Sequence, residues 1–268
     1  MKEFFGIGGY TREPEGFLSL EHLLFVSSLM LIMILMATFL GLRNRGRTPE
    51  QKNRVLIWAA VLIDGFELFK IALFTWNSDD PIGTIMRNLP LFLCSIQLIT
   101  IPLAAFCRAR LKEASLDFVF IFGILGAVLG TYGAGQNYNC YPVLSFDNVV
   151  SGITHSIAGF ASLYIVISGM ASMKRKNIKL TFMILAGFCI SALTVNLLTD
   201  YTNYMFLMRG DGTPYDIFYN MVGGNPVLYP IVVVALFLIY IVIFYYSYYA
   251  ICRKAIHRKC TKPENSIL

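Results

Sequence analysis

A thiol, Cys94, lies about two turns inside the apolar run 89–107, and a histidine, His155, lies inside the apolar run 149–172. A thiolate can attack an acyl carbonyl, and a neighbouring imidazole can remove the proton of the thiol. A thiol in apolar surroundings without such a base stays protonated and inert, so Cys94 needs a partner. Because His155 is the only histidine well inside such a run, the sequence indicates Cys94 and His155 as candidate catalytic residues.

The two residues are predicted at one depth. Each lies about six positions after the start of its run, hence roughly 9 Å below the outer surface at 1.5 Å per residue. We expect 89–107 to be a helix with Asn88 as N-cap and Pro90 in the first turn, so that Cys94 lies within the helix. Gln97, one turn further along, then shares a face with Cys94.

Three charged residues, Asp64, Glu67 and Lys70, recur every third position and therefore share one helical stripe. A charge near mid-bilayer costs about 2.5–3.5 kcal/mol on insertion scales, so this stripe should not face lipid. We predict that it points into the bundle and that Glu67 pairs with Lys70, either beside the candidate site or only for packing. Asn196 either closes the space inside the bundle that this stripe faces or serves as a polar contact between helices.

Composition places these residues in a membrane. The 268 residues are 56% hydrophobic and 14% charged, with a mean hydropathy of +0.62, which is typical of an all-α polytopic membrane protein. We expect one domain over residues 1–268, with seven spans of about 20 residues each. The predicted spans are 18–42, 55–76, 89–107, 116–134, 149–172, 178–199 and 227–252.

Cations alternate between successive connections, which fixes the orientation by the positive-inside rule. Every second connection has few cations, and these connections hold Asp79, Asp80, Asp147, Asp211 and Asp216. The pattern predicts an outside N-terminus and a cytoplasmic C-terminus. The net charge of +6 is then explained by topology and anionic lipids, and gives no reason to expect nucleic-acid binding. The cation-rich segments hold Arg43, Arg45, Arg47, Lys52 and Arg54; Arg108, Arg110 and Lys112; Lys174, Arg175, Lys176 and Lys179; and Arg253, Lys254, Arg258, Lys259 and Lys262.

The six cysteines show neither a CxxC pair nor metal-ligand spacing. We therefore expect no disulfide framework, no metal and no cofactor. Most of the cysteines are interpreted as small apolar residues that fill gaps between helices.

The connection after the sixth span contains Asn203 and Tyr204 within an unusually apolar segment, Asn203-Tyr204-Met205-Phe206-Leu207. Such a segment suits the headgroup level of a membrane. We expect it to fold over the outer mouth of the bundle and cover an opening between the third and fifth spans. The alternative is an ordinary aromatic belt.

These segments together resemble the YwaF family of bacterial integral membrane proteins, which belongs with the vertebrate transmembrane acyltransferase of ether phospholipids. The resemblance covers most of the chain, with one departure at Phe92, where the family commonly has a polar residue. The chain is also similar, more distantly, to the androgen-induced intramembrane hydrolases of fatty-acid esters. The motifs that carry it are Leu89-Pro90-Leu91-Phe92-Leu93-Cys94-Ser95-Ile96, Glu67, the His155 segment, and Asn203-Tyr204-Met205-Phe206-Leu207 with Thr213-Pro214.

The resemblance implies that Cys94 is the nucleophile and His155 the base of an intramembrane acyltransferase or lipid-ester hydrolase. Its substrate would be a membrane lipid or acyl chain, and its location the bacterial plasma membrane. A second hypothesis is a small-solute transporter or substrate-binding membrane component that uses Asp64, Glu67 and Lys70, with Gln97. A third is a non-catalytic scaffold. Neither the lipid nor the oligomeric state follows from the sequence.

Overall fold

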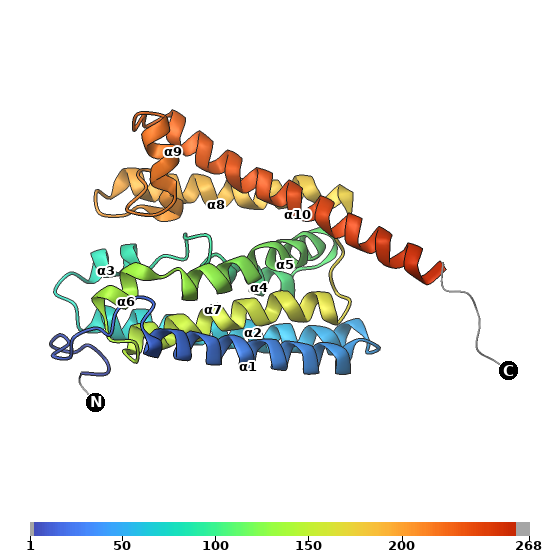
Figure 1. The fold of residues 1–268 in the computed structure, drawn as a ribbon, viewed down its shortest axis with the longest axis horizontal. Helices are drawn as coiled ribbons and strands as arrows, with labels where there is room; N and C mark the ends of the chain where they lie inside the picture. Colours follow the sequence, from blue (N-terminus) through green and yellow to red (C-terminus); the bar gives the residue numbers. More distant parts are fainter. Residues whose placement is uncertain (1–2, 261–268) are drawn as a thin grey trace. The chain divides into compact units, whose positions relative to one another are not determined.

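The computed structural model describes residues 3–260, and every regular element within them is a helix (Figure 1). The predicted all-α class is therefore confirmed. Lys262, one of the tail cations used for the topology prediction, lies outside the described residues. The α-helices are α1 (Leu20–Asn44), α2 (Pro49–Trp76), α3 (Pro81–Arg87), α4 (Gln97–Phe106), α5 (Ala109–Tyr132), α6 (Gly135–Cys140), α7 (Phe146–Ile167), α8 (Ile178–Leu198), α9 (Tyr215–Met221) and α10 (Leu228–Cys260), and the 3₁₀ helices are η1 (Arg175–Asn177) and η2 (Tyr204–Phe206).

The chain divides into two compact units, Met1–Met205 and Phe206–Leu268. The second unit contains α9 and α10, which pack against each other. Aromatic rings hold this pair together, since the rings of Tyr219 and Tyr229 meet edge to face with centroids 5.0 Å apart. The candidate site lies in the first unit.

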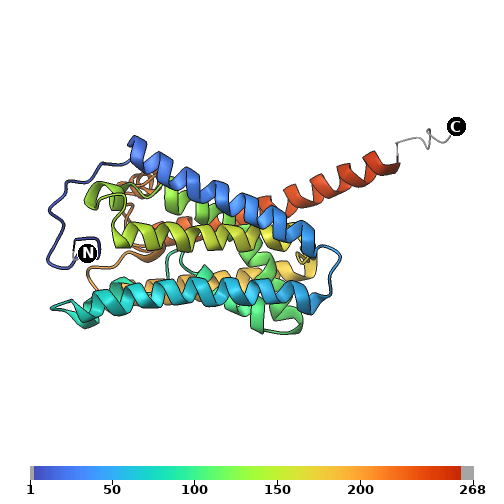
Figure 2. The ribbon, with the colours of Figure 1, turned by 90° about the horizontal axis from the view of Figure 1, so that it is seen from below.

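Helix α7 is the centre of the first unit. It packs against α5 and lies between α1 and α2 (Figure 2), while α5 also packs against α4 and α8. Glycines allow the close approach, because a Cβ atom at Gly159 of α7 would lie 2.3 Å from Met33 Sδ of α1 and 2.7 Å from Ala127 Cβ of α5. Small residues at such contacts are typical of helices that associate within membranes.

Side-chain caps fix where several of these helices begin. Ser19 Oγ accepts the His22 N–H at 3.2 Å at the start of α1, and Thr48 forms a reciprocal capping box with Gln51 at the start of α2. Ser145 Oγ accepts the Asn148 N–H at 3.3 Å at the start of α7. Each cap satisfies backbone donors that the first helical turn leaves unpaired.

Five helical segments are long and apolar enough to cross a membrane: Leu20–Asn44, Ala109–Cys140, Phe146–Ile167, Arg175–Leu198 and Leu228–Arg253. Helix α2 has 28 residues, which is also a spanning length, but it contains Asp64, Glu67 and Lys70. Helix α4 has only 10 residues. The chain is therefore a multi-pass membrane protein, while the count of seven spans and the orientation stay predictions.

The third predicted span is not one helix, which corrects the expectation for 89–107. Asn88 caps the C-terminus of α3 instead of the N-terminus of a long helix, and regular α-helix resumes only at Gln97. Residues 88–96 are turns, so Cys94 lies before α4 and not within it. Likewise α7 begins at Phe146, a few residues before the predicted start of the fifth span.

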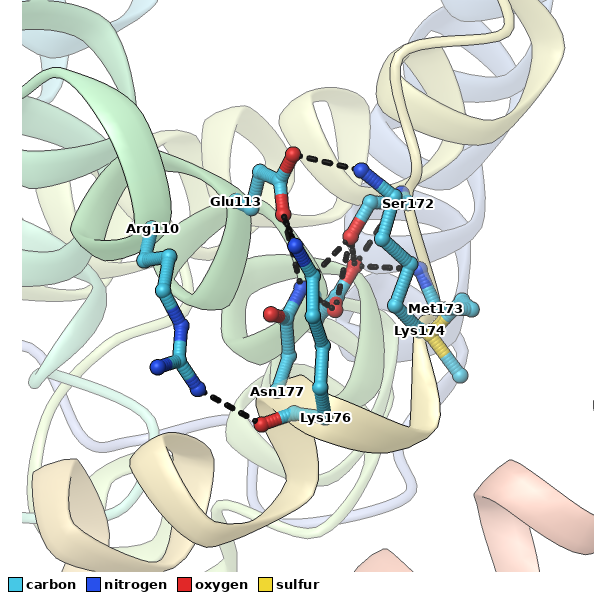
Figure 3. Close-up of polar contacts among 8 residues, drawn as sticks. Arg110, Glu113, Ser172, Met173, Lys174, Lys176 and Asn177 are labelled. Carbon is cyan, nitrogen blue, oxygen red and sulfur yellow. Dashed lines mark hydrogen bonds and ion pairs between the residues drawn. The ribbon is translucent and has the colours of Figure 1, made fainter.

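A buried carboxylate ties α5 to the connection between α7 and α8. Asp117 of α5 is fully buried and accepts the N–H groups of Ser172 and Met173 at 3.1 and 2.8 Å, and Asn177 Nδ2 at 3.1 Å. Close by, Lys174 Nζ lies 2.6 Å from Glu113 (Figure 3). This cluster fixes the connection that was predicted to be cytoplasmic.

Candidate active site

Cys94 lies in the irregular segment 88–96, immediately before α4, and is half-buried. Local bonds shape the segment: Ser95 Oγ accepts the Phe92 N–H at 3.0 Å, and the Ile96 N–H donates to the Phe92 carbonyl at 3.0 Å. Cys94 is therefore positioned by a short turn rather than by a long helix.

His155 lies on α7, and its hydrogen bonds define its tautomer. Nδ1 lies 2.7 Å from the Ser151 carbonyl oxygen and 3.3 Å from Ser151 Oγ. Because a carbonyl oxygen can only accept, Nδ1 carries a proton, and in the neutral ring Nε2 keeps its lone pair. Nε2 is buried and makes no hydrogen bond within the described part of the chain. The ring thus presents an unoccupied base.

Two glycines of α5 provide the surface against which both residues pack. A Cβ atom at Gly126 would lie 3.2 Å from Cys94 Cα, and one at Gly130 would lie 1.9 Å from His155 Cδ2 and 2.0 Å from His155 Nε2. Gly126 and Gly130 are one helical turn apart on one face. Cys94 and His155 consequently lie against neighbouring positions of α5.

The predicted ion pair between Glu67 and Lys70 is confirmed, with a third member. Lys70 is 8% exposed, and its Nζ lies 2.8 Å from Glu67 and 3.5 Å from Asp147, at the start of α7. Asp64 is only half-buried and has no ion pair with any residue that the structure describes. Within the stripe, Glu67 and Lys70 are therefore paired and Asp64 is not.

The segment Asn203–Leu207, which the sequence predicts to cover the mouth of the bundle, is called the lid segment below. Its Tyr204 contacts the Cys94 segment. Its buried hydroxyl donates to the Met86 carbonyl at 2.5 Å and accepts the Leu89 N–H at 3.0 Å, and its ring packs on Phe92 with centroids 4.9 Å apart. Asn196 of α8 holds Tyr204 through two backbone bonds of 2.8 and 3.0 Å.

Asn203, the residue before Tyr204, is also buried. Through its two bonds to Tyr204, Asn196 contacts the lid segment itself. This is a more specific role than the predicted contact between helices.

Gln97 is the first residue of α4 and is fully buried. An apolar groove of about 540 Å³ includes neither Cys94 nor His155. It is an open groove between the end of α2 and α3, one element before the Cys94 segment. Its lining residues are Leu68, Ile71, Ala72, Thr75, Trp76, Ser78, Pro81 and Ile85.

Three features of the site were missed in the sequence. The charge pattern places Asp147 in a connection, but it lies in the first turn of α7, where it pairs with Lys70. Ser151 lies one turn before His155, a spacing that allows its carbonyl to accept from the ring. Gly126 and Gly130 form a small-xxx-small pattern, which is a recognisable signal of close helix packing.

The fold and the site define a class: an all-helical, multi-pass membrane protein with polar residues gathered between its helices. The model of the TMEM164 family matches residues 17–248. Because this match covers most of the chain, the protein belongs to the TMEM164 family. Neither the curated proteins nor the solved structures contain a match.

Proposed function

We propose that this protein is an intramembrane lipid acyltransferase or lipid-ester hydrolase that uses Cys94 as nucleophile and His155 as base. The observation that carries the proposal is the tautomer of His155. The Ser151 carbonyl holds the Nδ1 proton, which leaves the Nε2 lone pair for the thiol, and α5 offers Cys94 and His155 adjoining glycine positions. A base oriented by a third group beside a nucleophile is the arrangement that covalent acyl transfer requires.

The reaction would proceed in two steps. His155 Nε2 takes the thiol proton, the sulfur forms a bond to the carbonyl carbon of a lipid ester, and the ester oxygen leaves with the proton from His155. The resulting thioester is then attacked by an alcohol of a second lipid or by water, whose proton His155 accepts. The C–S bond breaks, and the proton returns to the sulfur.

The surroundings suit a lipid substrate. Cys94 is half-buried, and the apolar groove between α2 and α3 includes residues of the helix that directly precedes the Cys94 segment, so it offers an acyl chain a place to bind. We place the site in the outer part of the bilayer, in a seven-span chain with an outside N-terminus. The plasma membrane of a bacterium and a YwaF-type lineage are part of the same proposal.

The transport hypothesis has less support, because Lys70 forms ion pairs with both Glu67 and Asp147, so these charges bind one another and not a solute. We therefore interpret these three residues as a support that joins α2 to the start of α7 beside His155.

A thiol substitution tests the proposal. Cys94→Ser and His155→Ala, in the full chain reconstituted in lipid vesicles, should each reduce acyl transfer by about 10³-fold or more, as loss of a nucleophile or its base does elsewhere. Cys107→Ser is the matched control, since Cys107 is equally half-buried at the other end of α4. Full turnover in Cys94→Ser would refute the mechanism, and the same loss in Cys107→Ser would show a general effect of cysteine removal.

A further inference from the structure

The side-chain amide of Gln97 is buried with its donor unused. Gln97 is fully buried, and its Oε1 accepts the Thr100 hydroxyl at 3.0 Å. Its Nε2 makes no hydrogen bond to any residue that the structure describes. A buried polar group without a partner destabilises the folded state, so the donor is kept in spite of a stability cost.

The unused donor lies next to the candidate nucleophile. Gln97 follows Cys94 by three residues, and the bonds from Ile96 N–H to the Phe92 carbonyl and from Leu98 N–H to the Ser95 carbonyl show helical turns there. Residues three apart in such turns share a face. Thr100 fixes the amide, because it occupies Oε1 and so determines which end of the side chain carries the free N–H groups.

The helix that follows Cys94 is a second favourable element. Cys94 lies immediately before the N-terminus of α4, and a helix N-terminus favours negative charge. When the sulfur has formed its bond to an acyl carbon, the negative charge that develops on the oxygen of that carbon lies near this N-terminus.

We propose that Gln97 Nε2 is a catalytic hydrogen-bond donor that stabilises the oxyanion of the acyl intermediate, with Thr100 as its positioning residue. The inference rests on the proposed function of Cys94. As the C–S bond forms, the π electrons of the C=O bond move to the oxygen, and Gln97 donates to that oxygen. The electrons return when the C–O bond to the leaving alcohol breaks, and the alcohol takes its proton from His155.

Two reagents separate this role from a structural one. Hydrolysis of p-nitrophenyl laurate passes through an oxyanion, whereas alkylation of a thiolate by iodoacetamide displaces iodide and forms none. Both are measured on the full chain in phosphatidylcholine vesicles, with alkylation read by mass spectrometry of the peptide that contains Cys94. The variants are Gln97→Met, which keeps the length but removes the donor, and Thr100→Val, which releases the amide.

For Gln97→Met we expect kcat for the ester to fall by about 10²–10³-fold, the effect of losing one oxyanion donor. Alkylation of Cys94 should be unchanged. The thermal midpoint should fall only slightly, because the variant removes a donor that was unpaired together with one hydrogen bond, that of the Thr100 hydroxyl to Oε1. Thr100→Val should show a smaller fall in kcat.

Unchanged ester hydrolysis in Gln97→Met, with Cys94→Ser inactive, would overturn the oxyanion role alone. Parallel loss of hydrolysis, alkylation and thermal stability would also overturn it and make Gln97 a structural residue. Full hydrolysis in Cys94→Ser would instead refute the thiol mechanism, and the inference with it.

Discussion

Gly130→Ala tests the position of His155 without changing a chemical group of the site. The added Cβ would lie 1.9 Å from His155 Cδ2 and 2.0 Å from Nε2. An ordinary carbon contact begins at 3.4 Å, so the imidazole, or α7 with it, must move by roughly 1.5 Å. Since the Ser151 carbonyl holds the other side of the ring, the movement disturbs the tautomer bond as well.

The expected effect on rate is large and the effect on stability modest. Displacing a catalytic group by about 1 Å can lower the rate about 10²-fold, so acyl transfer by Gly130→Ala should fall at least that far. Overpacking costs about 1–3 kcal/mol, partly offset by the higher helix propensity of alanine, worth about 0.8–1 kcal/mol. The folded chain should therefore persist, and transfer in vesicles together with the thermal midpoint measures both effects.

Gly187→Ala on α8 is the matched control, because a Cβ atom there would meet nothing within 4 Å. It should leave transfer unchanged and stability unchanged or raised by up to about 1 kcal/mol. Wild-type transfer in Gly130→Ala would refute the position of His155 against α5, and with it the argument that this glycine seats the base.

Three other predictions concern the ion pair, the lid and the topology. Lys70→Met should lower the free energy of unfolding by about 3–5 kcal/mol, since Glu67 loses its cation, whereas Glu67→Gln combined with Lys70→Met should cost less. Denaturation in detergent measures both variants, and a double variant less stable than the single one would contradict the pair. Tyr204→Phe should cost about 1–3 kcal/mol because the Met86 carbonyl and the Leu89 N–H lose their partner, while Tyr229→Phe, whose buried hydroxyl has no partner in the described chain, should cost nothing; equal thermal midpoints would count against the lid contact. Cys140 is exposed and should react with an impermeant maleimide added outside intact cells; reaction only after the cytoplasmic face is opened would reverse the predicted orientation.

Much of the fold follows from hydropathy. Six predicted spans correspond to α1, α2, α5, α7, α8 and α10, because a run of apolar residues bounded by charges permits little except a helix in a membrane. The third span failed because its first half is shaped by contacts that no local pattern reveals. Tyr204, far along the chain, binds the Leu89 N–H, and Ser95 closes a turn on Phe92, so a segment with helical composition takes another form.

The site was predictable in its residue types but not in its geometry. A thiol and a histidine well inside apolar runs indicate Cys94 and His155, and three-residue spacing predicts the Glu67–Lys70 pair. Asp147 could not be placed, because whether an acid joins a loop or a helix start depends on where α7 begins. The tautomer of His155 depends on the distance to a backbone carbonyl, which composition does not encode.

The anchoring of the α7–α8 connection by Asp117 has a practical consequence for protein engineering. Any sequence inserted among residues 172–177 would have to break bonds to a fully buried carboxylate, so fusion partners and epitope tags at this connection should prevent correct assembly. The turn between α1 and α2 is different, because Gly46 is exposed and has open space around it. A rigid fusion domain that enlarges the molecule for electron microscopy therefore belongs at Gly46.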